Sequence, residues 1–170
     1  ERIAVNATVP AVPAEEGPGV LARFPGCRTA KVKVAERGQT LRDDTDRVRA
    51  AREAMGDDAL IRVDANGGWS VGEAEAALRA LAPFGLEYAE QPCATIAELA
   101  ELRARLADGR GVAGVRIAAD ESVRKAEDPL AVARAGAADL LVVKAQPLGG
   151  VARALGIVRE AGLPVVVSSA

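Results

Sequence analysis

Short apolar runs alternate with longer amphipathic stretches along the whole chain. The runs are rich in Val, Ile and Leu, and are expected to form strands at residues 2–12, 29–35, 60–65, 86–90, 115–120, 140–144 and 164–169. The amphipathic stretches are expected to form helices at residues 41–55, 70–83, 96–106, 128–136 and 149–161. This alternation predicts a parallel sheet whose strands are connected by crossover helices.

Capping residues, glycines and prolines support several of these helix boundaries. Asp43 and Asp44 lie in the first turn of the helix 41–55, and Gly56 follows its end. Ser70 with Glu73 forms a capping-box pattern, and Asp128-Pro129 begins a later helix. Residues 13–19 are rich in Pro and Gly, and are expected to form a loop between a strand and a helix.

The ends of the strands distinguish two possible parallel folds. A doubly wound open sheet gathers its site at one switch point, whereas a (β/α)8 barrel gathers every strand end around one mouth. Here polar residues of catalytic type end five successive strands. We therefore predict an α/β fold of the (β/α)8 TIM-barrel type, with residues 1–170 as one domain.

The length does not accommodate a whole barrel. Barrels of this type need about 250 residues. The chain has 170 residues, starts without methionine and stops near its seventh strand. We expect an incomplete barrel of about strands one to seven, whose open edges would favour association.

Composition narrows the possible partners and the possible chemistry. The formal net charge is −2, basic and acidic residues are well mixed, and aromatic residues are only 2%. No apolar run is long enough to form a membrane helix, so we expect neither a nucleic-acid nor a membrane partner. The sequence leaves the oligomeric state open. Histidine is absent, so acid–base chemistry has to use Lys, Asp, Glu or Tyr.

The two cysteines give no sign of a metal site or a disulfide, and so bear mainly on the cellular compartment. Cys27 and Cys93 are far apart in the chain and match no metal-binding spacing. We expect ordinary thiols in a reducing cytoplasm, because the first residues show no signal-peptide pattern.

Three neighbouring strands each carry one carboxylate near the carboxyl end. These residues are Asp64, Glu90 and Asp120. Each alone would more often be a helix cap or a surface charge, but three at matching strand positions point to a shared site. Carboxylate oxygens suit Mg²⁺, whose octahedral shell is completed by water and substrate. We expect the three carboxylates to converge on one cation.

Lysines accompany these carboxylates on both sides. Lys31 and Lys33 share one face of their strand, and Lys144 ends an otherwise apolar strand. Taken separately, Lys31 and Lys33 could form the solvated face of an edge strand. Lys144 could be a strand-end lysine whose aliphatic stem is buried while its amine stays in water. Beside a divalent cation, a buried lysine loses proton affinity and can act as a base near neutral pH.

The strand-end motifs resemble those of one enzyme family. The chain is similar to the muconate-lactonizing-enzyme branch of the enolase superfamily in Lys31-Val32-Lys33, Asp64-Ala65-Asn66, Glu90-Gln91-Pro92, Asp120-Glu121-Ser122 and Val143-Lys144-Ala145. Residues 62–70, 88–93 and 143–150 are most similar to an actinobacterial group of dehydratases within that branch. The similarity extends over essentially the whole chain. It implies a partial C-terminal barrel domain, separated here from strand eight and from the N-terminal capping domain of the family.

The resemblance also implies roles for individual residues. The family's ligands for Mg²⁺, with Mn²⁺ as an alternative, correspond to Asp64, Glu90 and Asp120. Lys33 corresponds to the general base and Lys144 to a second catalytic lysine. Lysine bases combined with Mg²⁺ are an established arrangement of this superfamily. The residues implied in substrate binding are Lys31, Arg62, Asn66, Ser168 and Ser169.

The implied reaction is a syn-dehydration in menaquinone synthesis. A small-molecule substrate, a succinyl-hydroxycyclohexadiene carboxylate, would lose its α-proton to the base, form an enediolate and lose water to give 2-succinylbenzoate. Two alternatives remain: a racemase of N-succinylamino acids or epimerase of dipeptides, which would use lysines on both faces as bases, and an inactive barrel fragment.

Four further side chains are assigned by strand alternation and position. Glu87 and Glu121 are expected to point away from the mouth and to be structural. Tyr88 shares the face of Glu90 and is expected to fill the barrel interior. Trp69 is expected either to shelter the site or to pack between a helix and a loop.

Overall fold

One curved parallel sheet forms the centre of the computed structural model, which describes residues 3–107 and 114–169. In these residues each of seven strands pairs with the next one in sequence. The strands are β1 (Ala7–Val9), β2 (Thr29–Lys33), β3 (Leu60–Asp64), β4 (Leu86–Glu90), β5 (Arg116–Ala119), β6 (Leu140–Val143) and β7 (Val165–Val167). A doubly wound sheet would reverse its order at a switch point. The predicted barrel-type α/β fold is therefore confirmed, as a half-barrel.

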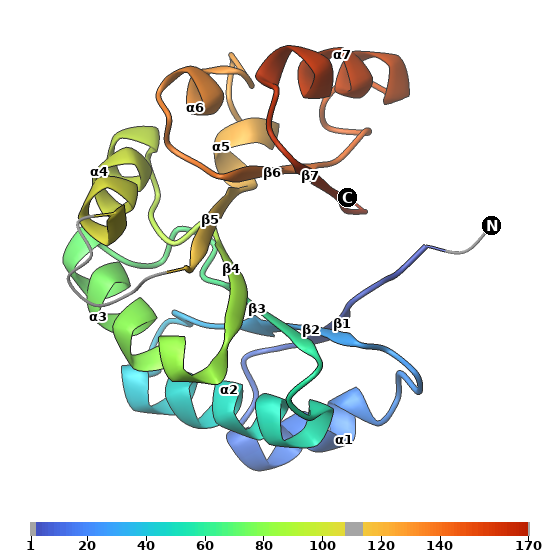
Figure 1. Ribbon diagram of the computed structural model, residues 1–170, viewed down its shortest axis with the longest axis vertical. Helices are drawn as coiled ribbons and strands as arrows, with labels where there is room; N and C mark the ends of the chain where they lie inside the picture. Colours follow the sequence, from blue (N-terminus) through green and yellow to red (C-terminus); the bar gives the residue numbers. More distant parts are fainter. Residues whose placement is uncertain (1–2, 108–113, 170) are drawn as a thin grey trace.

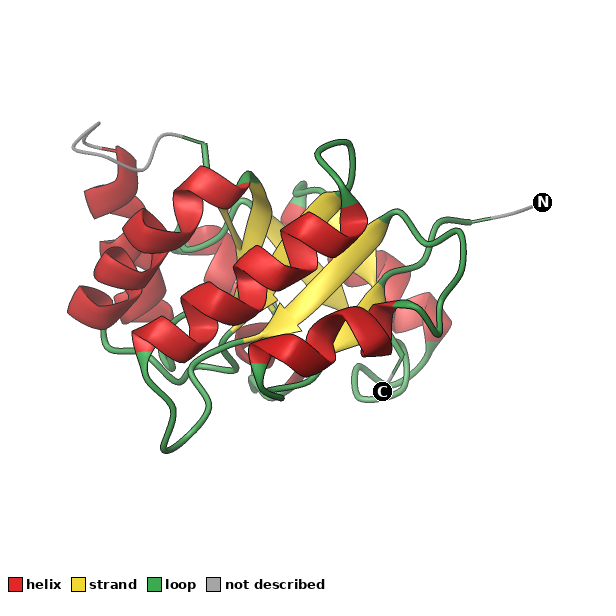
Figure 2. Ribbon diagram, turned by 90° about the horizontal axis from the view of Figure 1, so that it is seen from below, coloured by secondary structure: helices red, strands yellow, loops and turns green. Residues whose placement is uncertain are grey.

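The helices lie along the convex side of the sheet (Figure 1). They are α1 (Gly17–Leu21), α2 (Leu41–Met55), α3 (Val71–Leu81), α4 (Ile96–Ala107), α5 (Glu121–Arg124), α6 (Ala131–Arg134) and α7 (Val151–Ala161), with 3₁₀ turns η1 (Ala14–Glu16) and η2 (Ala82–Phe84). Figure 2 shows long helices crossing in front of the strands. Among the described residues no helix combines the length and apolar character needed to cross a bilayer.

Helix starts agree well with the local signals. Thr40 caps α2 and Ser70 caps α3, and Asp43 and Glu73 complete the two capping boxes. Each box satisfies backbone N–H groups that have no partner within the helix. The sequence therefore sets the direction in which the chain leaves β2 and β3.

The predicted boundaries are less accurate near the N-terminus and in the segment that follows β5. β1 covers only Ala7–Val9 of the expected range 2–12, of which Arg2 lies outside the described residues. The expected loop 13–19 instead forms η1 and the first residues of α1, because Pro18 is compatible with a first helical turn. The expected helix 128–136 is reduced to α6, and α5 was not predicted at all.

The main core lies between the sheet and the helices. Strand side chains that face the helices are almost fully buried, and include Val32, Val63, Ala89, Ile117 and Leu141. Full burial of an aliphatic side chain of this size contributes roughly 1.5–3 kcal/mol. A smaller cluster formed by Tyr88, Ala118, Leu140 and Val142 includes the interior position expected for Tyr88. Burial raises the pKa of the Tyr88 hydroxyl to about 12.

A buried ion pair connects α2 to the loops that follow β1 and β2. The side chain of Arg47 is 1% exposed, and lies 3.0 Å from Asp44 Oδ1. Its guanidinium also donates to the carbonyls of Val12, over 2.6 Å, and Lys33, over 2.9 Å. Asp44 Oδ2 accepts from the backbone N–H of Ala35 over 3.0 Å. The backbone around Lys33 is thus held from behind the sheet.

Replacing Arg47 by Ala should lower the free energy of unfolding by about 3–5 kcal/mol, because it leaves the buried Asp44 carboxylate without its cation. Urea denaturation measures this change. Arg42→Ala is the matched control on the same helix, because the Arg42 side chain is 91% exposed. It should change the stability by less than about 0.5 kcal/mol. Equal losses in the two variants would contradict the structural role of the buried pair.

Candidate active site

The pairing register of β2, β3 and β4 places their polar side chains in two rows on the inner face of the sheet. One row consists of the register partners Lys33, Asp64 and Glu90, and the row before it consists of Lys31, Arg62 and Tyr88. Alternate residues of a strand share one face, so the two rows point into the same space. The parallel order of β2, β3 and β4 therefore brings the predicted residues of these strands together.

Asp64 and Glu90 are buried carboxylates that share one lysine. Their side chains are 1% and 2% exposed, and Lys31 Nζ lies 3.1 Å from Asp64 Oδ2 and 3.2 Å from Glu90 Oε1. Lys33 Nζ lies 2.6 Å from the same oxygen of Asp64. Burial opposes ionisation of Asp64, but the charges of Lys31 and Lys33 outweigh it and lower the pKa of this carboxyl.

Lys31 is a half-buried lysine between two carboxylates. Burial alone would lower the pKa of Lys31, but the charges of Glu90 and Asp64 outweigh this effect and raise it. The loss of proton affinity expected beside a divalent cation stays a prediction.

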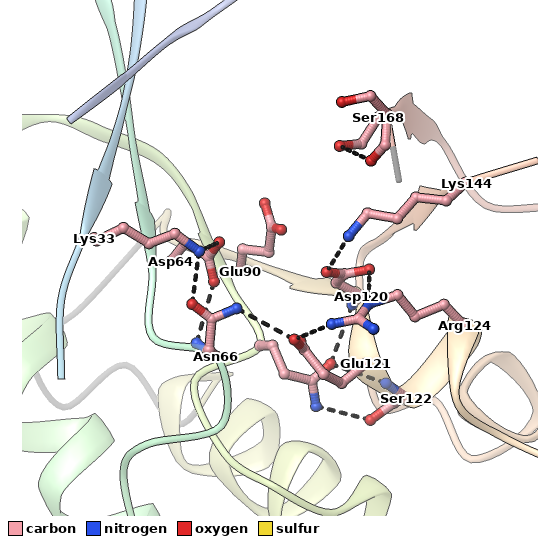
Figure 3. Close-up of polar contacts among 12 residues, drawn as sticks. Lys33, Asp64, Asn66, Glu90, Asp120, Glu121, Ser122, Arg124, Lys144 and Ser168 are labelled. Carbon is pink, nitrogen blue, oxygen red and sulfur yellow. Dashed lines mark hydrogen bonds and ion pairs between the residues drawn. The ribbon is translucent and has the colours of Figure 1, made fainter. Parts of the chain in front are cut away.

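The third carboxylate belongs to a separate group of charges on the other side of the mouth (Figure 3). Asp120 follows β5, and its side chain is 3% exposed. Lys144 Nζ lies 2.8 Å from Asp120 Oδ2, and Arg124 Nε lies 3.1 Å from Asp120 Oδ1. Lys33 and Lys144 therefore approach the carboxylates from opposite sides.

The expected convergence of Asp64, Glu90 and Asp120 on one point is not formed. Within residues 3–107 and 114–169, no three Asp, Glu, Cys or His side chains are grouped closely enough to hold a metal ion. Lysines and Arg124 instead take up the carboxylate oxygens. The role of the three carboxylates as ligands stays a prediction.

The chemistry of the three carboxylates nevertheless fits Mg²⁺. All are hard oxygen donors at the ends of adjacent strands, and all are nearly inaccessible to solvent. Burial, followed by the negative charge of Asp64, raises the pKa of Glu90 to about 7. The nearby lysine therefore does not fully compensate the negative charge of Glu90. A hard cation such as Mg²⁺ would complete this compensation.

The chain turns sharply after three of the strands that carry the site. Ala35, Asn66 and Gln91 follow the ends of β2, β3 and β4 with φ angles of 59°, 48° and 39°. A left-handed conformation in a residue other than glycine costs roughly 1–3 kcal/mol. At Asn66 it lets the backbone N–H donate to Asp64 Oδ1 over 3.1 Å.

Gln91 is a site-supporting residue that the sequence did not single out. It is fully buried, and its Oε1 accepts from the backbone N–H groups of Asp120 and Ser122, each over 3.1 Å. Its Nε2 donates to the carbonyl of Cys93 over 2.9 Å and to Ser122 Oγ over 2.8 Å. Gln91 thus connects the end of β4 to the end of β5. No periodicity or spacing could have indicated these contacts.

Glu87 lies differently from the expectation, because it contacts the inward-facing Arg62. The pairing of β3 and β4 shifts between Ile61 and Arg62, so that Glu87 is an extra residue in β4. This bulge breaks the strand alternation, and Glu87 Oε2 accepts from Arg62 Nε over 2.6 Å. The guanidinium of Arg62 also lies 4.9 Å from the centre of the Tyr88 ring. Arg62 is therefore engaged beneath the row of carboxylates, and its role in substrate binding stays a prediction.

Glu121 and Arg124 are polar residues of the mouth that strand alternation did not assign to it. α5 begins at Glu121, directly after Asp120, so the alternation used to point Glu121 away no longer applies. Glu121 Oε1 accepts from Asn66 Nδ2 over 3.2 Å and from Arg124 over 2.7 Å. Arg124 could have been found from its spacing of four residues after Asp120, which is a helical ion-pair spacing.

The remaining candidates lie at the margin of this group. Ser168 and Ser169 follow β7, and Ser168 is near Lys144 in Figure 3. Ser168 Oγ donates to the carbonyl of Ser169 over 3.2 Å. Trp69 packs against the main core and forms a backbone bridge with Cys93. Packing is therefore the role that the structure gives to Trp69.

The whole arrangement agrees with a comparison against known families. Residues 20–169 match the family described as "Enolase C-terminal domain-like". The chain belongs to this family. Its strand-end lysines and carboxylates are thus placed within a known enolase-type domain.

Curated members similar to this enolase-type chain come from mycobacteria. It is 61% identical over 171 aligned residues to the o-succinylbenzoate synthase of Mycolicibacterium smegmatis, covering 100% of this chain and 50% of that protein. The o-succinylbenzoate synthase of Mycobacterium leprae is 60% identical, and 48% of it is covered. The chain spans about half the length of the curated relatives it matches.

Solved enolase-type structures of other activities have the same fold. The L-Ala-D/L-Glu epimerase from Bacillus subtilis matches with a TM-score of 0.84 and 28% identity, covering 98% of this chain and 46% of that chain. A racemase from Streptomyces coelicolor with bound magnesium matches with a TM-score of 0.80 and 27% identity, covering 98% and 50%. The fold alone therefore does not distinguish between the reactions of the family.

Gly68→Ala should displace the turns that follow β2 and β3. A Cβ atom at Gly68 would lie 2.9 Å from Ala35 Cβ and 3.0 Å from the carbonyl oxygens of Ala35 and Ala65. We expect a loss of about 1–3 kcal/mol in the free energy of unfolding, measured by urea denaturation.

The matched control for this substitution is Gly72→Ala in α3. A Cβ atom at Gly72 would meet nothing within 4 Å. Its stability should be unchanged or slightly higher, because Ala favours helix more than Gly does. A Gly68→Ala protein as stable as the Gly72→Ala protein would show that the close approach of the two turns is not required.

Proposed function

We propose that the chain forms the reaction end of an o-succinylbenzoate synthase. This carbon–oxygen lyase would remove water from a succinyl-hydroxycyclohexadiene carboxylate and form 2-succinylbenzoate for menaquinone synthesis. The observation that carries the proposal is the approach of Lys33 and Lys144 to buried carboxylates from opposite sides (Figure 3). The 61% identity to curated o-succinylbenzoate synthases favours this reaction over others of the family.

Lys33 is the proposed general base. Its Nζ lies 2.6 Å from both Asp64 Oδ2 and Asn66 Oδ1 at the carboxyl end of β2. The neutral amine would take the proton α to the substrate carboxylate, and the electrons of that C–H bond would enter the enediolate. The resulting ammonium would then donate the proton to the departing hydroxyl as the C–O bond breaks. One residue can perform both transfers because the elimination is syn.

Lys31 and Lys144 would act mainly through their charge. Both are held beside buried carboxylates, at side-chain exposures of 16% and 15%. Fixed ammonium groups in a poorly hydrated site stabilise an enediolate more strongly than water does. Asp64, Glu90 and Asp120 would hold Mg²⁺, which supplies further positive charge for the substrate carboxylate when bound.

The proposed partner is a small-molecule carboxylate, with neither nucleic acid nor membrane involved. Cations gathered inside the half-barrel suit a substrate with negative charge. The free thiols of Cys27 and Cys93 fit a cytoplasmic location. Burial raises the pKa of Cys93 to about 11, so this thiol is not suited to be a nucleophile.

A racemase or epimerase is the second candidate, and it is favoured by the same pair of lysines. Racemisation uses two bases on opposite faces, one to remove the proton and one to return it. Lys33 and Lys144 lie on opposite sides of the mouth (Figure 3). A solved structure with the same fold is an L-Ala-D/L-Glu epimerase.

Substitution of the two lysines separates these reactions. The protein is produced together with any coding sequence that flanks the chain and is assayed for dehydration. Lys33→Ala and Lys33→Arg should abolish activity, because these 170 residues contain no histidine that could replace the base. Lys144→Ala should lower kcat by about 10²–10³-fold, since it removes a charge that faces the enediolate. Lys144→Arg should keep measurable activity, because it keeps that charge.

Lys125→Ala is the control, because Lys125 is an exposed lysine outside these contacts. It should leave kcat unchanged. Efficient racemisation of N-succinylamino acids by the wild type, without dehydration, would replace the proposed function by the second candidate.

A further inference from the structure

Asn66 connects the proposed base to Glu121 on the far side of the β3 turn (Figure 3). Lys33 Nζ donates to Asn66 Oδ1 over 2.6 Å. Asn66 Nδ2 donates to Glu121 Oε1 over 3.2 Å. The two ends of one amide thus contact a cation and an anion from different elements of the fold.

Glu121 is also connected to Lys144, through Arg124 and Asp120. Arg124 Nη2 lies 2.7 Å from Glu121 Oε1, and Arg124 Nε lies 3.1 Å from Asp120 Oδ1. Lys144 Nζ lies 2.8 Å from Asp120 Oδ2. The polar contacts therefore run without a break from Lys33 to Lys144, and Glu121 connects Asn66 to Arg124 within them.

The two charges determine which way the Asn66 amide faces. An ammonium needs an acceptor and a carboxylate needs a donor. Turning the amide by half a rotation would place its NH₂ against Lys33 and its oxygen against Glu121, so that both contacts would become repulsive. The charge of Glu121 therefore favours the orientation that presents oxygen to Lys33.

The burial of Glu121 is unusual for a residue that only stabilises a short helix. Its side chain is 15% exposed, and within the described part of the chain Oε2 is buried without a hydrogen-bond partner. An unsatisfied buried acceptor costs roughly 1–3 kcal/mol. The contacts of Oε1 with Asn66 and Arg124 have to offset this cost.

From these contacts we propose that Glu121 is a positioning residue for Lys33. Glu121 accepts from the Asn66 amide and so keeps Asn66 Oδ1 directed at the amine of Lys33. Arg124 holds Glu121 in place, because it contacts both Glu121 and Asp120. The proposed role needs no contact of Glu121 with the substrate or the reacting atoms. The catalytic part of this inference rests on the proposed role of Lys33 as the base.

The first test compares three variants of the protein produced with any flanking coding sequence. Glu121→Ala should lower kcat about tenfold and change KM less than about twofold, because the base is misplaced while substrate contacts remain. Glu121→Gln keeps an oxygen for Asn66 and Arg124, and should recover most of kcat. Glu127→Ala removes an exposed carboxylate three residues beyond Arg124, and should have no effect.

The second test asks whether Glu121 acts through Asn66. Asn66→Gly removes the amide and tolerates the φ of 48°. Adding Glu121→Ala to Asn66→Gly should cost less than about twofold more in kcat, because the contact that it acts through has already been removed. Additive losses would overturn the proposal.

The third test does not depend on the activity. Amines are acetylated with an activated ester, with and without added Mg²⁺, and quantified by mass spectrometry. In Glu121→Ala the labelling rate of Lys33 should rise severalfold, because the amine loses a fixed acceptor. The rate of Lys31 should not change, because its contacts are with Asp64 and Glu90.

The labelling result separates this proposal from the proposed function. A wild type without dehydratase activity would refute the function, and selective labelling of Lys33 would still support the positioning contact. An unchanged Lys33 rate would overturn the inference. Equal increases at Lys31 and Lys33 would overturn it as well, because they would indicate a general loosening of the mouth.

Discussion

Compensation of buried negative charge is the constraint on which the mouth of this half-barrel depends. Asp64, Glu90 and Asp120 are almost inaccessible to water, and an isolated buried ion costs several kcal/mol. Lysines from β2 and from the end of β6 supply most of the compensation. It is incomplete at Glu90, whose pKa is raised to about 7. This imbalance makes the site suited to a further cation.

The sheet can bring these charges together because its two faces have different compositions. Aliphatic residues on the outer face are buried under the helices, whereas the inner face carries the charged rows. The two layers remain coupled, because Arg47 of α2 bonds to the carbonyl of Lys33 from behind the sheet. A buried contact of a helix on the outer side of the sheet therefore helps to place the proposed base.

Opposed lysines make the same scaffold suitable for more than one reaction. A single base can carry out a syn-dehydration, while two bases on opposite faces can racemise a carbon atom. A solved structure with the same fold is an epimerase, so the fold alone does not decide between the two reactions.

The sequence by itself determined the parallel α/β architecture, the bounds of α2 and β4, and the shared face of Lys33, Asp64 and Glu90. These follow from local periodicity and capping, which neighbouring residues decide. Only the tertiary structure decided that Glu87 turns toward Arg62, that Glu121 reaches Asn66, and that each carboxylate is paired with a cation rather than grouped with the others. A bulge, a helix that starts directly after a strand, and the pairing of charges depend on contacts between distant segments, which local patterns do not contain.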